Sequence, residues 1–174
     1  MDRFGNPCTV KKTTLAERRR MKGCRNGVLI EECLFKRLNC IRAEGGGALY
    51  FFQKNSHITV NQCCFSDCST PCGYGGALLC FSSKNVITRN SFLRCYSGGS
   101  KMQACNLEVD GGEPNLFEEC YVCQCCRLKE GDDVSVQLTS GDILSQYSNF
   151  TQNSLSGYGV LGLALTDNGN VRHC

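Results

Sequence analysis

The stretch Gly46-Gly47-Ala48-Leu49 returns later in the chain, with the same four residues, as Gly75-Gly76-Ala77-Leu78. The two tetrads are 29 residues apart, and the Phe-x-x-Cys tetrads that follow them, Phe65–Cys68 and Phe92–Cys95, are 27 residues apart. A fixed period of this size is the sequence signature of a repeat architecture. Residues 46–95 therefore predict a solenoid built from similar coils that stack on one another.

Each copy of the repeat contains three short apolar segments, which in the first copy are residues 49–52, 58–60 and 64–65. Gly, Ser and Asn separate the segments, and these residues tolerate the backbone conformations of tight turns. The segments are rich in aromatic and β-branched residues and are too short for helices. Three strands and three turns per period predict one coil of a right-handed parallel β-helix, with coils about 4.8 Å apart. A leucine-rich repeat has a similar period, but its Leu-x-x-Leu-x-Leu pattern is absent.

Size and composition are consistent with one domain that has a sizeable core. The chain has 174 residues, of which 41% are hydrophobic and 20% charged, and it contains 19 Gly and 16 Cys but no Trp. No apolar run approaches the roughly 20 residues of a membrane-spanning helix. Residues 1–7 lack the apolar segment of a secretory signal. The sequence therefore leaves the localisation open, and we expect either an intracellular chain or a piece of a longer protein.

The N-terminal segment, residues 1–25, is basic and is predicted to cap the repeats. Residues 1–30 carry eight Lys or Arg against two acidic residues, whereas the whole chain has a net charge of +3. Thr14 and Glu17 have the spacing of a capping box and Gly23 can end a helix, which predicts a short helix over residues 13–23. The alternative is a patch for nucleic acid or anionic lipid at residues 18–22. Without interleaved aromatic residues we favour the cap and expect no nucleic-acid partner.

The repeats are predicted to occupy residues 26–174 as about five or six coils. The last coil stops before its expected Phe tetrad, so we expect an incomplete C-terminal end that is available for self-association. One ladder of inward-facing rings is expected, with a Cys or Asn ladder beside it, and its members are Phe35, Phe65, Phe92, Phe117 and Phe150. The residues that define the repeat are Gly46, Gly47, Ala48, Leu49, Phe65, Cys68, Gly75, Gly76, Ala77, Leu78, Phe92, Cys95, Phe117, Cys120, Phe150 and Asn153.

The alternation of Gly-Gly-Ala-[Ile/Leu/Val] with Phe-x-x-Asn resembles the repeats of the chlamydial polymorphic outer-membrane proteins. Gly46–Leu49 and Gly75–Leu78 match the first tetrad, and Phe150–Asn153 matches the second. Cysteine takes the Asn position in three other tetrads, at Cys68, Cys95 and Cys120. The resemblance covers residues 26–174, and it implies a right-handed parallel β-helix that is displayed at a cell surface or secreted and used for adhesion.

The cysteines recur at equivalent positions of the repeat. Cys68, Cys95 and Cys120 follow Phe-x-x, and Cys33 and Cys63 lie two residues before a Phe. Equivalent positions stack in a solenoid, so we favour ladders of buried free thiols. Disulfides in an oxidising compartment and a structural zinc site are the alternatives. The zinc candidates lack the paired spacing of zinc fingers, and they are Cys120, Cys123, Cys125 and Cys126.

A divergent or incomplete carbohydrate-active enzyme of the pectinase type is the functional alternative. Gly131-Asp132-Asp133 is superficially similar to the Asp pair of polygalacturonases, but the accompanying Gly-His-Gly and Arg-x-Lys motifs are missing. The two histidines, His57 and His173, lie in turn-like or terminal positions. A calcium-dependent lyase would need a basic residue close to a set of acidic ligands, for which the candidates are Asp110, Asp132, Asp133 and Asp142.

We therefore predict a non-enzymatic solenoid that binds a protein or a glycan, with no catalytic residue and no cofactor. An intracellular scaffold is a third possibility, favoured if all sixteen thiols are free. The chain holds one N-glycosylation sequon, Asn149-Phe150-Thr151, whose Asn lies beside a Phe that is expected to point inward.

Overall fold

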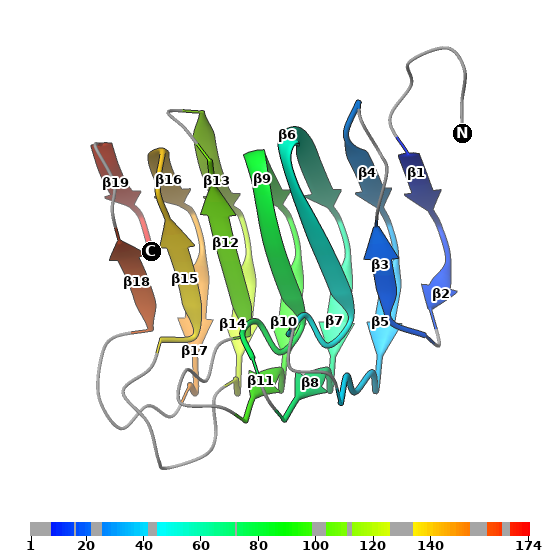
Figure 1. Ribbon diagram of the computed structural model, residues 1–174. Helices are drawn as coiled ribbons and strands as arrows, with labels where there is room; N and C mark the ends of the chain where they lie inside the picture. The colour runs from blue at the N-terminus through cyan, green and yellow to red at the C-terminus, as the bar shows by residue number, and fades with distance from the viewer. Residues whose placement is uncertain are drawn as a thin grey trace.

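The strands of the described chain pair only in parallel, as expected for a solenoid. The computed structural model describes residues 8–15, 17–21, 26–41, 45–71, 73–98, 104–110, 113–125, 134–153, 160–164 and 168–174. Within these ranges the chain forms nineteen strands and no helix (Figure 1). The predicted all-β parallel solenoid is confirmed.

The largest sheet has eleven strands, and most coils cross it twice. In two coils a single long strand makes both crossings, namely β6 (Leu49–Asn61) and β9 (Leu78–Thr88). The other strands of this sheet are β1 (Cys8–Lys11), β3 (Arg19–Met21), β4 (Val28–Glu31), β12 (Cys105–Val109), β13 (Pro114–Glu118), β15 (Val136–Thr139), β16 (Asp142–Gln146), β18 (Leu161–Ala164) and β19 (Asn168–Arg172).

A six-stranded sheet lies behind the front strands β6, β9, β12 and β15 (Figure 1). Its strands are β2 (Thr14–Leu15), β5 (Leu34–Lys36), β7 (Cys64–Ser66), β10 (Ser91–Leu93), β14 (Tyr121–Cys123) and β17 (Asn149–Thr151). The third sheet pairs two short strands, β8 (Ser69–Thr70) and β11 (Tyr96–Ser97).

The glycine tetrads hold neighbouring coils close together. Gly46 and Gly75 both have φ of +63°, which favours glycine. A Cβ on Gly47 would lie 2.0 Å from the carbonyl oxygen of Gly76, so the second glycine is needed for the approach of the next coil. Leu49 consequently pairs with Leu78, and Phe65 with Phe92, which confirms the period read from the sequence.

The core contains a stack of fully buried rings that runs from coil to coil. We call Phe35, Phe65 and Phe92 the inner aromatic stack. Their ring centroids are separated by 4.6 Å and 4.9 Å, close to the spacing of parallel strands. All three side chains are 0% exposed.

Phe117 is not the next member of this ladder, which corrects the predicted register. Val122 pairs with Phe92, whereas Phe117 lies on β13 and pairs with Ile87. The ring of Phe117 still reaches the core, with its centroid 6.1 Å from that of Phe92. The predicted register was wrong because a Phe-x-x-Cys tetrad can occupy either of two corners of the coil.

The helix predicted over residues 13–23 is wrong. β2 pairs with β5, and β3 pairs with the first half of β6, so this part of the chain extends the sheets. The parallel ladder gives the backbone hydrogen-bond partners on a neighbouring strand, and the local capping-box spacing does not outweigh it. β1, β2 and β3 therefore already belong to the solenoid, and residues 16, 22 and 23 of the predicted helix lie outside the described residues.

Candidate functional site

Each coil enters and leaves the six-stranded sheet through a corner at which one non-Gly residue has a left-handed backbone. The values of φ at these residues lie between 48° and 55°. The first-corner residues are Lys12, Glu32, Gln62, Arg89, Glu119, Tyr147 and His173, and the second-corner residues are Arg37, Asp67, Arg94, Gln124 and Gln152. In most coils Cys, Asn or Ser follows directly, and its side chain bonds to the backbone of the neighbouring coil.

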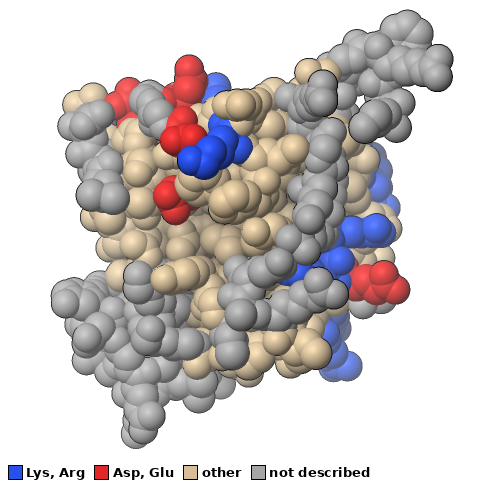
Figure 2. All heavy atoms as spheres, in the orientation of Figure 1, with Lys and Arg blue, Asp and Glu red and all other residues tan. Residues whose placement is uncertain are grey.

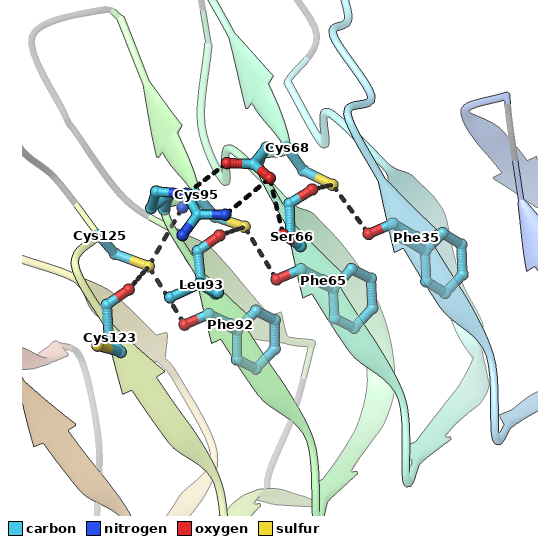
Figure 3. Close-up of polar contacts among 11 residues, drawn as sticks. Phe35, Phe65, Ser66, Cys68, Phe92, Leu93, Cys95, Cys123 and Cys125 are labelled. Atoms are coloured by element: carbon cyan, nitrogen blue, oxygen red, sulfur yellow. Dashed lines mark hydrogen bonds and ion pairs between the residues drawn. The ribbon is translucent and has the colours of Figure 1, made fainter.

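The second-corner ladder consists of Cys68, Cys95 and Cys125, which Figure 3 shows, and of Asn153 on the next coil. The backbone N–H of Cys95 donates to Sγ of Cys125 (3.3 Å), and the N–H of Cys125 donates to Oδ1 of Asn153 (2.8 Å). Asn153 donates from Nδ2 to the carbonyl of Val122 (3.0 Å), and Sγ of Cys125 lies 3.6 Å from the carbonyl of Phe92. A thiol here makes the same two contacts as the asparagine amide, which explains why Cys replaces Asn in this repeat.

The first-corner ladder consists of Cys33, Cys63, Asn90, Cys120 and Ser148, and it follows the same rule. The N–H of Cys33 donates to Sγ of Cys63 (3.4 Å), and the N–H of Cys63 donates to Oδ1 of Asn90 (2.8 Å). Further along, the N–H of Cys120 donates to Oγ of Ser148 (3.2 Å). Cys120 therefore belongs to the ladder of Cys33 and Cys63, and Cys125 takes the place beside Cys95 that was predicted for Cys120.

Burial makes three of the ladder thiols, Cys63, Cys95 and Cys120, poor nucleophiles and poor metal ligands, because only the thiolate acts in either role. The pKa of Cys68 is lowered instead, by its side-chain hydrogen bond with Cys95. Desolvation raises the pKa of Cys63 and of Cys120 to about 12. It also raises the pKa of Cys80, Cys95 and Cys105. We therefore interpret the ladder thiols as structural hydrogen-bonding groups.

The zinc candidates are divided among different environments. Cys120 lies in the first-corner ladder, Cys125 lies in the second-corner ladder, and Cys123 on β14 is 7% exposed. Cys126 lies outside the described residues. In the described part of the chain, no group of three or more His, Cys, Asp or Glu side chains is placed to hold a metal ion. Twelve described cysteines are free, and Cys8 is disulfide-bonded.

A second set of stacked rings lies outside the core, on β6 and β9. We call Tyr50, Phe52 and Phe81 the outer aromatic stack. The centroids of Phe52 and Phe81 are 4.7 Å apart and those of Tyr50 and Phe52 are 6.3 Å apart, with interplanar angles of 17° and 8°. Phe52 is 52% exposed, so a large ring on a described sheet face is left in contact with solvent.

Two cationic side chains contact the outer aromatic stack from opposite ends. The Arg18 guanidinium lies 5.1 Å from the Tyr50 ring centroid, and it donates to the carbonyls of Gly45 (2.5 Å) and Gly46 (2.8 Å). Lys54 Nζ lies 5.2 Å from the Phe81 ring centroid and 3.5 Å from a carboxylate oxygen of Asp110. These cation–π contacts hold the rings in place without covering Phe52.

Polar side chains continue the same outer face along the solenoid axis. Leu79 of β9 pairs with Asn106 of β12, and Phe81 pairs with Glu108. The next coil adds Gln137 and Thr139 at these positions. Uncharged side chains make up most of the face in Figure 2, with a group of basic and acidic side chains near its upper edge. The face thus offers aromatic surface at one end and amide, hydroxyl and carboxylate groups beyond it.

The residues considered for catalysis do not share a contact in the described chain. Asp110 pairs with Lys54, whereas Asp142 accepts a hydrogen bond from Asn168 (2.9 Å). His57 is exposed on β6, where a Cβ on Gly27 would meet its ring. Asp132 and Asp133 lie outside the described residues.

The outer aromatic stack was not predicted from the sequence, although a signal for it exists. Residues 49–52 are all apolar, and successive side chains of a strand point to opposite faces. Leu49 and Phe51 are buried, so Tyr50 and Phe52 must face outward. An uninterrupted apolar run in a strand of a solenoid thus indicates an exposed apolar face as well as a core.

No family model, curated protein or solved structure matches the chain. The described residues contain no helix long and apolar enough to cross a membrane. The resemblance to polymorphic outer-membrane proteins therefore stays a prediction, and the parallel β-solenoid is what the structure establishes.

Proposed function

We propose that this chain is a non-enzymatic binding module that contacts a protein or glycan partner through the outer aromatic stack. The observation that carries the proposal is the exposure of Phe52, which is 52% exposed yet held between Tyr50 and Phe81. Aromatic and arginine side chains are the groups most often responsible for binding energy at protein interfaces. The resemblance of the repeats to an adhesive surface family favours the same role.

The fixed position of the rings supports binding. Side chains that are mobile in the free protein lose conformational entropy when a partner orders them. Arg18, Lys54 and the neighbouring rings already restrict the outer aromatic stack. A partner would therefore gain contact with ordered aromatic surface at little entropic cost.

The experiment compares the adhesion of beads coated with the purified chain, or with variants, to cultured cells. We expect Phe52→Ala to weaken retention by about tenfold or more, as for a residue at the centre of an interface. Gln137→Ala is the matched control, because it changes the same sheet face three coils away from Phe52. Treating the cells with glycosidases or with protease identifies the partner as glycan or protein.

Two results would contradict the proposal. Wild-type beads that adhere no better than uncoated beads would exclude an adhesive role for this chain. Adhesion of Phe52→Ala equal to that of wild type, with an unchanged circular dichroism spectrum, would show that the outer aromatic stack only stabilises the sheet.

A further inference from the structure

We propose that Asn149 is an acceptor for an N-linked glycan on the back of the solenoid. Asn149 opens β17, and its side chain is exposed, whereas Phe150 packs against the core. The alternation along the strand turns Phe150 inward and Asn149 outward.

Asn149 differs from the asparagines that serve the fold. The amides of Asn85, Asn90 and Asn115 are buried, and each donates to backbone carbonyls. A glycan at any of these positions would have to replace core hydrogen bonds. No side-chain hydrogen bond joins Asn149 to the described residues, while its backbone N–H donates to Cys120 O (2.8 Å). Its amide can therefore be modified without loss of a contact in the fold.

The surroundings of Asn149 leave space for a bulky polar group. The residue that pairs with it on the neighbouring coil is Tyr121, which is 43% exposed. Thr151 is the third residue of the sequon, and its hydroxyl donates to the Tyr121 hydroxyl (3.0 Å) on the solvent side of the six-stranded sheet.

The donor is a lipid-pyrophosphate-linked oligosaccharide. In the transfer, Nδ2 of Asn149 forms a bond to the anomeric carbon of the reducing-end sugar, and the bond from that carbon to the phosphate oxygen breaks. The lipid pyrophosphate leaves, and the amide proton passes to a base of the transferase. No oxidant or reductant is required.

Asn149 and the outer aromatic stack lie on different sheets of the solenoid. β17 belongs to the six-stranded sheet, behind the strands β6 and β9 that carry the outer aromatic stack (Figure 1). A glycan at Asn149 would cover the back of the solenoid and leave Phe52 accessible. The inference does not depend on the proposed binding function, but it is compatible with it.

The test translates the whole chain, behind a cleavable secretory leader, in the presence of microsomes and in secreting eukaryotic cells. We expect a gel shift that a peptide N-glycosidase removes, with conversion of Asn149 to aspartate in the peptide mass. Asn149→Gln and Thr151→Ala should abolish the shift, and Thr151→Ser should keep it. Asn106→Gln, which changes an outward-facing Asn outside any sequon, should leave it unchanged.

Absence of the shift in microsomes would overturn the proposal whether or not the chain folds, because transfer occurs on the nascent chain. Modification in microsomes followed by retention in cells, when Asn149→Gln is secreted, would also overturn it, since the fold would then be unable to carry the glycan. Secretion of glycosylated wild-type protein supports it.

Discussion

The inner and outer aromatic stacks are built in the same way but have different environments. Phe65 and Phe92 in the core are 4.9 Å apart, and Phe52 and Phe81 on the surface are 4.7 Å apart. The inner rings are 0% exposed, whereas Phe52 is 52% exposed. Stacking of equivalent residues is thus a consequence of the coil spacing, and burial decides what a stack contributes. The inner rings stabilise the fold, and the outer rings are available to a partner.

Removing an inner ring should have the largest effect. Phe92 lies between Phe65 and Phe117, so Phe92→Ala leaves a cavity that the neighbouring coils cannot easily fill. We expect the free energy of unfolding to fall by about 3–5 kcal/mol in chemical denaturation. A loss below about 1 kcal/mol would show that Phe92 is not a core residue, and the two stacks would then be equivalent.

Removing a ladder thiol should have an intermediate effect. Cys125→Ala leaves the N–H of Cys95 without its acceptor, which should cost about 1–3 kcal/mol. Cys125→Asn is the matched variant, because Asn153 makes the equivalent contacts one coil further on. We expect Cys125→Asn to retain more than half of the stability that Cys125→Ala loses. Equal losses in the two variants would contradict the hydrogen-bonding role of the thiol.

Removing an outer ring should have a small effect on stability. Phe52→Ala exposes little new apolar surface and removes only cross-strand contacts, so we expect a loss of about 1 kcal/mol or less. The measurement is the same denaturation experiment used for Phe92→Ala. A loss as large as that of Phe92→Ala would mean that the outer stack is structural, and the proposed binding role would lose its basis.

Removing the ion pair between Arg94 and Asp67 at the second corner should have the smallest effect on stability, and only at acidic pH. Arg94 donates to both carboxylate oxygens of Asp67 (2.5 and 3.0 Å) and thereby lowers the pKa of Asp67 to about 2. Because the unfolded value is about 3.9, the contribution of Asp67 is present above about pH 4 and is lost as the pH falls towards 2. We expect Asp67→Asn to flatten the pH dependence of thermal unfolding in this interval. If the pH dependence of thermal unfolding is the same in Asp67→Asn and in the wild type, the ion pair contributes no stability in solution.

The sequence predicted the solenoid because its strongest signals are local and repeated. Gly46 and Gly75 mark positions where a left-handed backbone is needed, and their period fixes the register of Leu49 on Leu78 and of Phe65 on Phe92. Burial of alternate residues in these strands then follows from strand geometry. Such features are independent of distant parts of the chain.

The register beyond residue 104 could not be predicted, for a physical reason. Both corners follow the same four-residue pattern. A residue whose side chain points into the core comes first, and one whose side chain points outward comes second. The third residue has a left-handed backbone conformation, and the fourth belongs to a ladder. Phe92 precedes Cys95 at the second corner, and Phe117 precedes Cys120 at the first. The left-handed residues themselves, such as Glu119 and Arg94, are not types that favour this conformation. A Phe-x-x-Cys tetrad therefore identifies a corner without telling which one.

The candidate site could be predicted only in part. The thiol ladders follow from equivalent positions in the repeat, but the outer aromatic stack depends on which half of an apolar run faces outward. Its cations come from Arg18 and Lys54, which approach the rings from different coils. Such contacts depend on the three-dimensional stacking of coils, and no local motif encodes them.

Thiol accessibility in the native protein tests the division between interior and surface most directly. Time-resolved alkylation, read by peptide mass spectrometry, should modify the exposed Cys174 first and the partly exposed Cys64 next. Cys80, Cys95 and Cys105 are 0% exposed, and we expect them to react only after denaturant is added. Reaction of these buried cysteines at the rate of Cys174 in native protein would contradict the stacked core.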